Sequence, residues 1–317
     1  MTRLKEGFGS LEYRQGIPTP DIANLRNGGA MAQGEMRLRI WDVEHGACAM
    51  LQHVNGGVGG RLAMIDSGST SGWRPSTFIK NDLGRDRLDY LFITNADQDH
   101  MSDLQGLWDA GINVQVLVRN RSYTGEQIKQ IKLQSGPLTD DAERYVSACS
   151  TFNQPVSEPF NEHMGGITAT MFWNRYPTFT NTNDLSLVVF IKYAGCKFLF
   201  PGDLEKAGWR ALLQREDFRD ELKYTDILVA SHHGRESGFC PELFNYCEPS
   251  AVIISDKPIE HETQQMVPDY RAVVREDGVP VRTTGKRRHV LTTRRDGWIQ
   301  ITVASNGYYS IDTEYEG

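Results

Sequence analysis

The stretch Asn95-Ala96-Asp97-Gln98-Asp99-His100 is the most informative part of this 317-residue chain. It follows the apolar run 88–93, which predicts a buried strand, and it precedes a helix predicted over 102–110. Enzymes with α/β folds build their sites at such strand ends. Two close carboxylates repel each other, so burying both requires a cation or a proton nearby. The stretch therefore predicts a metal-binding loop, and the alternative is a solvated acidic turn in which Asp99 or Ser102 caps the helix.

Two further polar clusters follow predicted strands downstream. Gly202 and Asp203 come directly after a strand predicted over 196–200, and His232 and His233 follow a strand predicted over 226–230. Gly202 permits a tight turn that presents the Asp203 carboxylate at the strand tip. Imidazole is a usual ligand of zinc, iron and nickel, and carboxylates suit manganese. Each cluster alone also fits an ordinary surface turn, but three strand-end clusters in this order favour a metal site.

The order of the predicted elements indicates two halves, each with strands followed by helices. The first half has strands over 37–43, 47–53, 61–65, 88–93 and 114–118, then helical residues over 122–152 with a break near Gly136 and Pro137. The second has strands over 167–173, 185–193 and 196–200, a helix over 206–214, strands over 226–230 and 251–255, a helix near 268–275 and terminal strands to about 313. This pattern predicts an αββα sandwich of two sheets with helices outside. We assign it to residues 35–317 and treat residues 1–34, which are polar and turn-rich, as an N-terminal arm.

The composition is that of an ordinary globular protein, with 39% hydrophobic and 24% charged residues. The net charge of −7 argues against a protein that coats nucleic acid by bulk attraction. No apolar run reaches ~18 residues, and the N-terminus lacks an apolar secretory segment, so we expect a cytoplasmic protein without a membrane span. The five cysteines form no C-x-x-C pair, which favours reduced thiols over disulfides.

In sequence order, these motifs resemble the metallo-β-lactamase superfamily and, within it, the ComEC-like subgroup of hydrolase domains known from DNA uptake. That subgroup shows a D-V-G-Q-G-D-A-like opening, an I-D-x-G turn, H-x-D-x-D-H, N-x-x-S-L-V, T-G-D and H-H-G. The corresponding segments here are Asp42-Val43-Glu44-His45-Gly46-Ala47-Cys48, Ile65-Asp66-Ser67-Gly68, the stretch 95–100, Asn183-Asp184-Leu185-Ser186-Leu187-Val188, Pro201-Gly202-Asp203 and His232-His233-Gly234. The resemblance covers roughly residues 36–303 and implies the four-layer αββα metallo-β-lactamase sandwich.

The resemblance also implies roles for single residues. Asp203 would bridge two metal ions, held by Asp97 at the first position and at the second by Asp99, His100 and either His232 or His233. Water activated by the metal would attack a phosphorus or carbonyl centre, and Asp99 could orient that water. Asn183 and Ser186 match the N-x-x-S-L-V motif and would line the site as substrate contacts.

Asn95 departs from the family pattern, because it replaces the first histidine of the loop. A neutral amide is a poor transition-metal ligand, although its carbonyl oxygen can bind a hard cation. The chain could therefore hold one divalent ion, hold two oxygen-loving ions, or be a degenerate binding module. Zinc or manganese is the expected metal, with magnesium as a further candidate. Asp99, Asn95 and His45 are the candidate catalytic residues, and His45 either contacts substrate or only forms a hydrogen-bonded turn.

A basic segment lies near the C-terminus of this acidic chain. It places six positive charges within fourteen positions, at Arg282, Lys286, Arg287, Arg288, Arg294 and Arg295. Such a segment suits contacts with nucleic-acid phosphates, although a solvated hairpin face is the alternative. We take Lys286, Arg287 and Arg288 as candidate substrate contacts.

The expected function is therefore that of a phosphodiesterase or nuclease acting on a nucleic acid or a nucleotide. A second hypothesis is a non-catalytic interaction module, in which the N-terminal arm contacts a protein partner. A third is a hydrolase of small-molecule esters or lactones.

Overall fold

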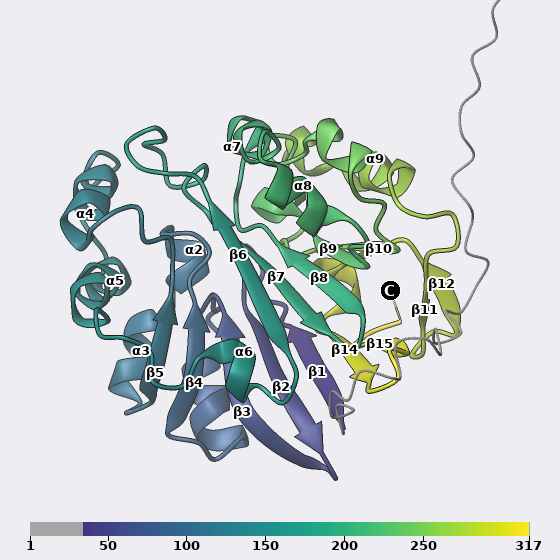
Figure 1. Cartoon of the computed structure of the whole chain (residues 1–317), viewed down its shortest axis with the longest axis horizontal. Coiled ribbons are helices and arrows are strands. Elements are labelled where there is room, and N and C mark those ends of the chain that lie inside the picture. The colour runs from purple at the N-terminus through teal and green to yellow at the C-terminus, as the bar shows by residue number, and fades with distance from the viewer. Residues whose placement is uncertain (1–33, 317) are drawn as a thin grey trace, which may run out of the picture. The chain divides into compact units, whose positions relative to one another are not determined.

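Two β-sheets make up the centre of the computed structural model, which describes residues 34–316 (Figure 1). The larger sheet contains β1 (Glu35–Ile40), β2 (Ala49–Asn55), β3 (Val58–Ile65), β4 (Arg87–Phe92), β5 (Asn113–Val118), β11 (Val279–Val281), β12 (Lys286–Arg288), β14 (Ile299–Ala304) and β15 (Tyr309–Thr313). Its strand order is β12-β11-β15-β14-β1-β2-β3-β4-β5. The smaller sheet contains β6 (Thr168–Trp173), β7 (Leu187–Tyr193), β8 (Cys196–Phe200), β9 (Ile227–Val229), β10 (Ala251–Ile254) and β13 (Val290–Thr292), in the order β13-β10-β9-β8-β7-β6.

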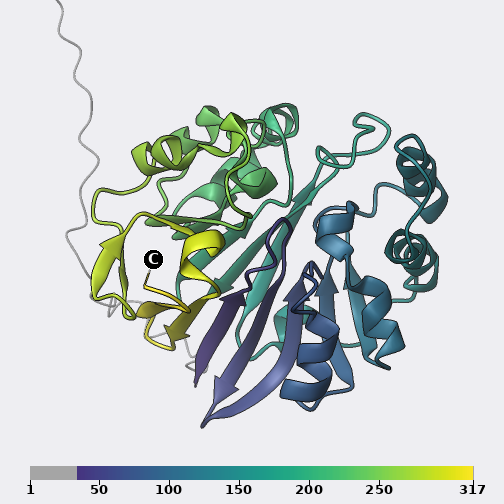
Figure 2. The same ribbon diagram turned by 180° about the vertical axis from the view of Figure 1, so that it is seen from behind.

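Helices lie on the outer face of each sheet. The larger sheet carries α1 (Pro75–Thr77), a π-helical segment η2 (Phe78–Asp82), α2 (Gln98–Met101), α3 (Leu104–Asp109), α4 (Gly125–Leu133) and α5 (Asp140–Thr151). The smaller sheet carries α7 (Lys206–Leu212), α8 (Glu216–Leu222) and α9 (Val267–Ala272), with short turns η3 (Ser231–Gly234), η4 (Pro241–Asn245) and η5 (Glu262–Gln264). Two short helices, α6 (Phe160–His163) and α10 (Thr293–Asp296), precede β6 and β14. The view from behind shows the blue helices against the nine-stranded sheet (Figure 2).

Three apolar layers hold these elements together. The central layer lies between the sheets and is built from alternate strand residues such as Leu38, Val189 and Ile301, all fully buried. A second layer joins the nine-stranded sheet to its helices, and a third joins the six-stranded sheet to α7, α8 and α9. Each fully buried aliphatic side chain contributes roughly 1.5–3 kcal/mol. The predicted αββα four-layer sandwich is thus confirmed.

The helical region predicted over 122–152 does break where Gly136 and Pro137 stand. α4 begins after Thr124, whose side chain and that of Gln127 form a reciprocal capping box, and α5 begins after Thr139, which caps it. The sequence reading missed α8. Its apolar residues Phe218 and Leu222 are four positions apart and both buried, but they lie in a short, highly charged segment.

Other expectations concern the ends and the thiols of the chain. The N-terminal arm, residues 1–34, lies outside the described residues apart from Gly34. All five cysteines are buried free thiols, as expected for reduced residues. Among the helices of the described part, none combines the length and the apolar character needed to cross a membrane.

Candidate metal centre

The site forms where the carboxyl ends of strands from both sheets meet. β3 and β4 are parallel neighbours in one sheet, and β8, β9 and β10 are parallel neighbours in the other. The loops that follow these strands bring four side chains together: Asp99, His100, Asp203 and His233. One ligand atom from each lies within 4.8 Å of the others, and all but Asp99 are buried. The structure thus unites three of the strand ends that the sequence singled out.

The loop that follows β4 is packed tightly against the turn that follows β3. A Cβ atom on Gly68 would lie 2.6 Å from the carbonyl oxygen of Ala47 and 2.7 Å from that of Asp99, so only glycine fits there. The backbone N–H of Ser67 also donates to the carbonyl of His100 at 2.8 Å. The I-D-x-G turn therefore fixes the position of the loop that carries Asp99 and His100.

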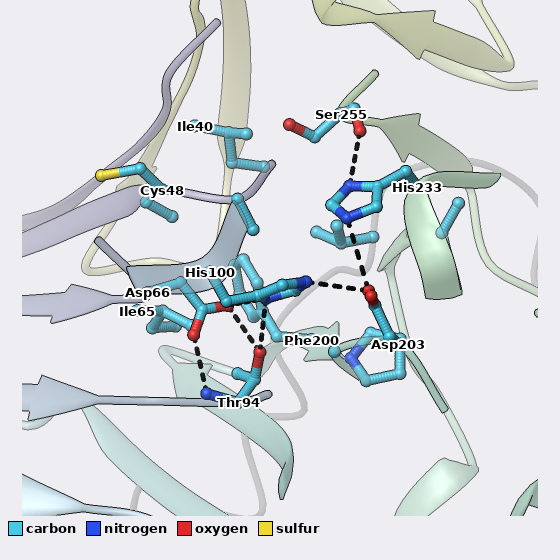
Figure 3. Close-up of a pocket in the computed structure, with 16 residues that line it drawn as sticks. Ile40, Cys48, Ile65, Asp66, Thr94, His100, Phe200, Asp203, His233 and Ser255 are labelled. Atoms are coloured by element: carbon cyan, nitrogen blue, oxygen red, sulfur yellow. Dashed lines mark hydrogen bonds and ion pairs between the residues drawn. The ribbon is translucent and has the colours of Figure 1, made fainter. Parts of the chain in front are cut away.

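His100 is oriented by a buried carboxylate behind it. Its Nδ1 lies 2.9 Å from Asp66 Oδ2, and its Nε2 lies 3.0 Å from Asp203 Oδ1 (Figure 3). Thr94 holds Asp66 with its backbone N–H at 2.7 Å and its hydroxyl at 2.5 Å. Because a carboxylate only accepts hydrogen bonds, Asp66 keeps the proton on Nδ1 and leaves Nε2 available as a ligand.

We expect Asp66→Asn to weaken metal binding by about 10–100-fold, as loss of such an orienting partner typically does. The ligand atoms all remain, but Nδ1 of His100 loses the carboxylate that fixes its ring. Competition with a chromogenic chelator measures the affinity. Asp82→Asn, on an exposed segment away from the site, is the control, and equal affinities for the two variants would contradict this role of Asp66.

Asp203 follows β8 on a tight turn. Gly202 has φ of 60°, a conformation that favours glycine, as the sequence predicted. The backbone N–H of Asp203 donates to the Ser186 hydroxyl at 3.1 Å. Ser186 is fully buried, so the structure places it behind Asp203 as a support rather than as the substrate contact that the resemblance implied.

His233 follows β9 in a strained turn. His232 and His233 both adopt left-handed backbone angles, with φ of 50° and 55°, which cost about 1–3 kcal/mol each and recur at functional sites. The Nδ1 of His233 lies 3.0 Å from the Ser255 carbonyl, and its Nε2 lies 3.1 Å from Asp99 Oδ2 and 3.5 Å from Asp203 Oδ1. Nε2 therefore points into the cluster.

His232 turns away from that cluster. Its Nδ1 lies 2.8 Å from the Ser237 hydroxyl and 3.2 Å from Glu205 Oε1. Of the two neighbouring histidines that the sequence left open as ligands, the structure brings His233 to the site and gives His232 a place in the surrounding hydrogen-bond network.

The charges of the four residues fit a divalent cation. Burial opposes ionisation of His100, but Asp203 and Asp66 raise its pKa well above the usual range, and Asp203 and Asp99 also raise the pKa of His233. Against the same burial, the two imidazoles lower the pKa of Asp99 and that of Asp203. A divalent cation carries the charge of two protons. It can therefore replace the Nε2 protons of His100 and His233 and bind to the two nitrogens that they leave free. Two imidazoles and two carboxylates are ligands that zinc and manganese both accept.

His45 borders the same cluster. Its Nε2 lies 3.3 Å from Asp99 Oδ2, and its Nδ1 lies 3.3 Å from Oδ1 of the fully buried Asp256. The ring packs on His233 with 4.6 Å between centroids. Its side chain is 31% exposed. Of the two roles that the sequence left open, this position favours contact with a substrate.

Asn95 and Asp97, the other predicted loop residues, do not join the four-residue cluster. Asp97 pairs with Lys132 at 2.5 Å and accepts from the Thr182 hydroxyl at 2.6 Å. Asn95 donates to Asn183 at 3.0 Å. The resemblance implied a first metal position at Asp97, and the structure instead shows these residues bound to one another and to Lys132.

Three of the six charges of the basic segment form ion pairs within the described residues: Arg282 with Asp312, Arg288 with Asp296 at 3.1 Å and Arg294 with Asp256 at 3.8 Å. Arg287 donates to the carbonyls of Asp277 and Gly278. Lys286, Arg287 and Arg288 form edge strand β12, and none is within ion-pair distance of the four-residue cluster. Contact between this strand and a nucleic acid stays a prediction.

Three residues near the cluster were not assigned a role from sequence. Asp66 belongs to the I-D-x-G motif, so its place in that motif was the available signal. Asp256 follows β10 just as the other site residues follow their strands, and that strand-end position could have indicated it. Arg235 comes directly after the H-H-G motif, but nothing in the spacing shows that its guanidinium faces His45.

Comparisons with known proteins identify relatives of the chain. A family model described as the metallo-beta-lactamase superfamily matches residues 44–235. ComE operon protein 3 of Bacillus subtilis (strain 168) is 23% identical over 176 residues, which are 54% of this chain and only 20% of that protein.

Two solved structures are similar at low identity. A crystal structure from Parabacteroides distasonis, assigned as a metal-dependent hydrolase, matches with a TM-score of 0.42 and 13% identity over 81% of this chain and 93% of that chain. CmlA, a diiron beta-hydroxylase from Streptomyces venezuelae, matches with a TM-score of 0.40 and 14% identity over 70% of this chain and 45% of that chain.

Proposed function

The chain belongs to the metallo-beta-lactamase superfamily, and from that premise we propose that it is a metal-dependent hydrolase of phosphodiester bonds in nucleic acids or nucleotides. The observation that carries the proposal is the buried cluster of Asp99, His100, Asp203 and His233, with both imidazoles oriented by outer partners. A binding module would not need to maintain two carboxylates and two imidazoles at such close range.

The four residues of the cluster would hold the metal. When bound there, a divalent metal lowers the pKa of water to about 7 and polarises a phosphoryl or carbonyl oxygen. The chain's own contribution is to hold the ligands in place through Asp66, Ser186 and the Ser255 carbonyl. Ile40, Phe200 and Val229 supply apolar walls to the pocket that contains His100, Asp203 and His233.

His45 is placed to handle a proton at the site. Asp256 accepts from its Nδ1 and is itself fixed by Gln264, which donates at 2.7 Å. Asp256 therefore orients the His45 imidazole, as a carboxylate does beside a catalytic histidine, and His45 Nε2 is left facing Asp99. We assign His45 the transfer of a proton to the leaving oxygen.

Arg235 supports an anionic substrate. One of its terminal nitrogens lies 3.4 Å from His45 Nε2, and its Nε is buried without a hydrogen-bond partner among the described residues. No carboxylate in residues 34–316 lies within ion-pair distance of its guanidinium. A guanidinium left free beside the cluster can bind a phosphate through paired hydrogen bonds. This favours a phosphodiester over a neutral lactone.

We expect Arg235→Gln to raise KM for a phosphodiester about 10–100-fold while changing kcat much less. Hydrogen bonds to charged groups contribute about 1.5–3 kcal/mol, and ~1.4 kcal/mol corresponds to a factor of ten. Steady-state kinetics give both constants. Arg210→Gln, which breaks only an exposed pair with Glu242, should match the wild type. A fall in kcat with unchanged KM would refute the substrate-binding role.

The ComEC-like subgroup and a nucleic-acid substrate are part of the same proposal. The ordered motifs of the chain and the match to ComE operon protein 3 support the subgroup. A substrate panel tests the class directly: single-stranded DNA, RNA, a cyclic nucleotide, bis-p-nitrophenyl phosphate and a lactone. Cleavage of the phosphodiesters but not of the lactone is the expected outcome. Lactone hydrolysis alone would replace the proposal with the small-molecule alternative.

The non-catalytic module remains the second candidate. The pairing of Asp97 with Lys132 favours it, because it removes one position at which the family binds metal. The intact four-residue cluster argues for the enzyme.

A further inference from the structure

We propose that the centre binds a single metal ion and that the Lys132 ammonium takes the role of the second cation, as the permanent counter-ion of Asp97. This inference rests on the proposed function, since it concerns the same site. It deepens that function by assigning the centre one metal ion and by giving Asp97 a lysine counter-ion in place of a second metal.

Both oxygens of the Asp97 carboxylate are already occupied. Lys132 Nζ lies 2.5 Å from Oδ1, and the Thr182 hydroxyl donates to Oδ2 at 2.6 Å. The ion pair is sheltered, with the Lys132 and Asp97 side chains 19% and 31% exposed. A metal at this carboxylate would have to displace a charge-assisted hydrogen bond and a hydroxyl together.

The side-chain amides of Asn95 and Asn183 belong to a chain of hydrogen bonds in which each donor and acceptor is fixed. The backbone N–H of Asp97 donates to Asn95 Oδ1 at 3.1 Å, which fixes the amide nitrogen of Asn95 as a donor. That nitrogen donates to Asn183 Oδ1 at 3.0 Å, and Asn183 donates in turn to Glu205 at 3.3 Å. Each amide oxygen therefore already accepts a hydrogen bond. With Asn95 buried, the side chains of Asn95, Asp97 and Asn183 offer a second ion no imidazole and no unpaired carboxylate.

Lys132 lies on α4, which packs with α5 and positions the lysine beside Asp97. Ile128 is buried and lies one helical turn before Lys132, so both project from the same face of α4. The loop is tied to the same pair of helices, because Gln98 donates to Asp141 at 2.7 Å and accepts from Thr139 at 2.5 Å. The lysine is thus a fixed part of the site rather than a mobile surface charge.

Manganese binding to the protein tests the number of metal ions that each chain holds. We expect one Mn²⁺ per chain by calorimetric titration and elemental analysis, with the electron paramagnetic resonance spectrum of an isolated ion. Two ions per chain with an exchange-coupled spectrum would overturn this inference and leave the proposed function standing. No bound ion would overturn the proposed function and this inference with it.

A pair of double variants tests whether Lys132 is the excluding group. Asn95→His combined with Lys132→Met supplies an imidazole and frees Asp97, so we expect a second Mn²⁺ and a coupled spectrum. Asn95→His combined with Lys129→Met removes a charge from the same helix but keeps the Asp97 ion pair, so one ion should remain. A second ion in both double variants, or in neither, would refute the role given to Lys132.

Discussion

Asp203→Asn is expected to lower kcat/KM for a phosphodiester by at least about 10³-fold, because Lewis-acid action of a metal contributes several kcal/mol and each ~1.4 kcal/mol corresponds to a factor of ten. Among the described residues, Asp203 is the carboxylate that lies within ion-pair distance of both imidazoles of the cluster, at 3.0 Å from His100 and 3.5 Å from His233. The amide keeps its shape but loses the charge that the cation requires.

The loss should appear in metal content as well as in rate. Elemental analysis after desalting should find the variant depleted of metal at concentrations that saturate the wild type. Asp217→Asn, on the exposed surface of α8, provides the matched control and should behave as the wild type does. Full activity in Asp203→Asn would remove this residue from the metal centre.

His45→Ala is expected to reduce kcat by about 10²–10⁴-fold, the usual contribution of a positioned proton-transfer group. The metal should stay bound, because His45 lies outside the group of four ligands. This combination distinguishes His45 from the cluster residues, because substitution of a cluster residue should lower both the metal content and the reaction rate.

The choice of substrate sharpens this prediction. A p-nitrophenolate leaving group needs little protonation, whereas a nucleoside alkoxide needs much. The variant should therefore lose far less activity on bis-p-nitrophenyl phosphate than on a dinucleotide. Equal losses on both substrates would contradict the proton-transfer role, and so would wild-type rates on the dinucleotide.

The fold was largely predictable because its strands are apolar and regular. The segments 88–93 and 196–200 carry enough hydrophobic residues to require burial, and the polar residues directly after them marked the strand ends. α8 escaped prediction because tertiary packing of Phe218 and Leu222, and not a long amphipathic repeat, stabilises it.

Predicting the cluster partly succeeded for a similar reason. Asp99, His100, Asp203 and His233 each belong to a motif at a strand end, so position along the chain was informative. Which of two adjacent histidines faces inward depends on the left-handed turn at His232 and His233. That turn is set by packing of separate elements and cannot be inferred from the residue types alone.

Asp97 shows most clearly what could not be predicted from the sequence. Its ligand role followed from the family pattern, but its partner Lys132 lies 35 residues further along the chain, on α4. Only the docking of the α4–α5 pair against the loop brings the ammonium to the carboxylate. Asn95 signalled that the first position was altered, and the structure shows Asp97 paired with Lys132 at that position.

Metal-restored cleavage of single-stranded DNA is the most direct test of a metal-dependent phosphodiesterase. Full-length protein is stripped with a chelator, reloaded with Mn²⁺, Zn²⁺ or Mg²⁺, and assayed beside Asp99→Ala. We predict no cleavage by the stripped protein, cleavage after reloading with at least one of these ions, and none by Asp99→Ala under any condition. Absence of cleavage by the reloaded wild type, or equal cleavage by Asp99→Ala, would contradict the account.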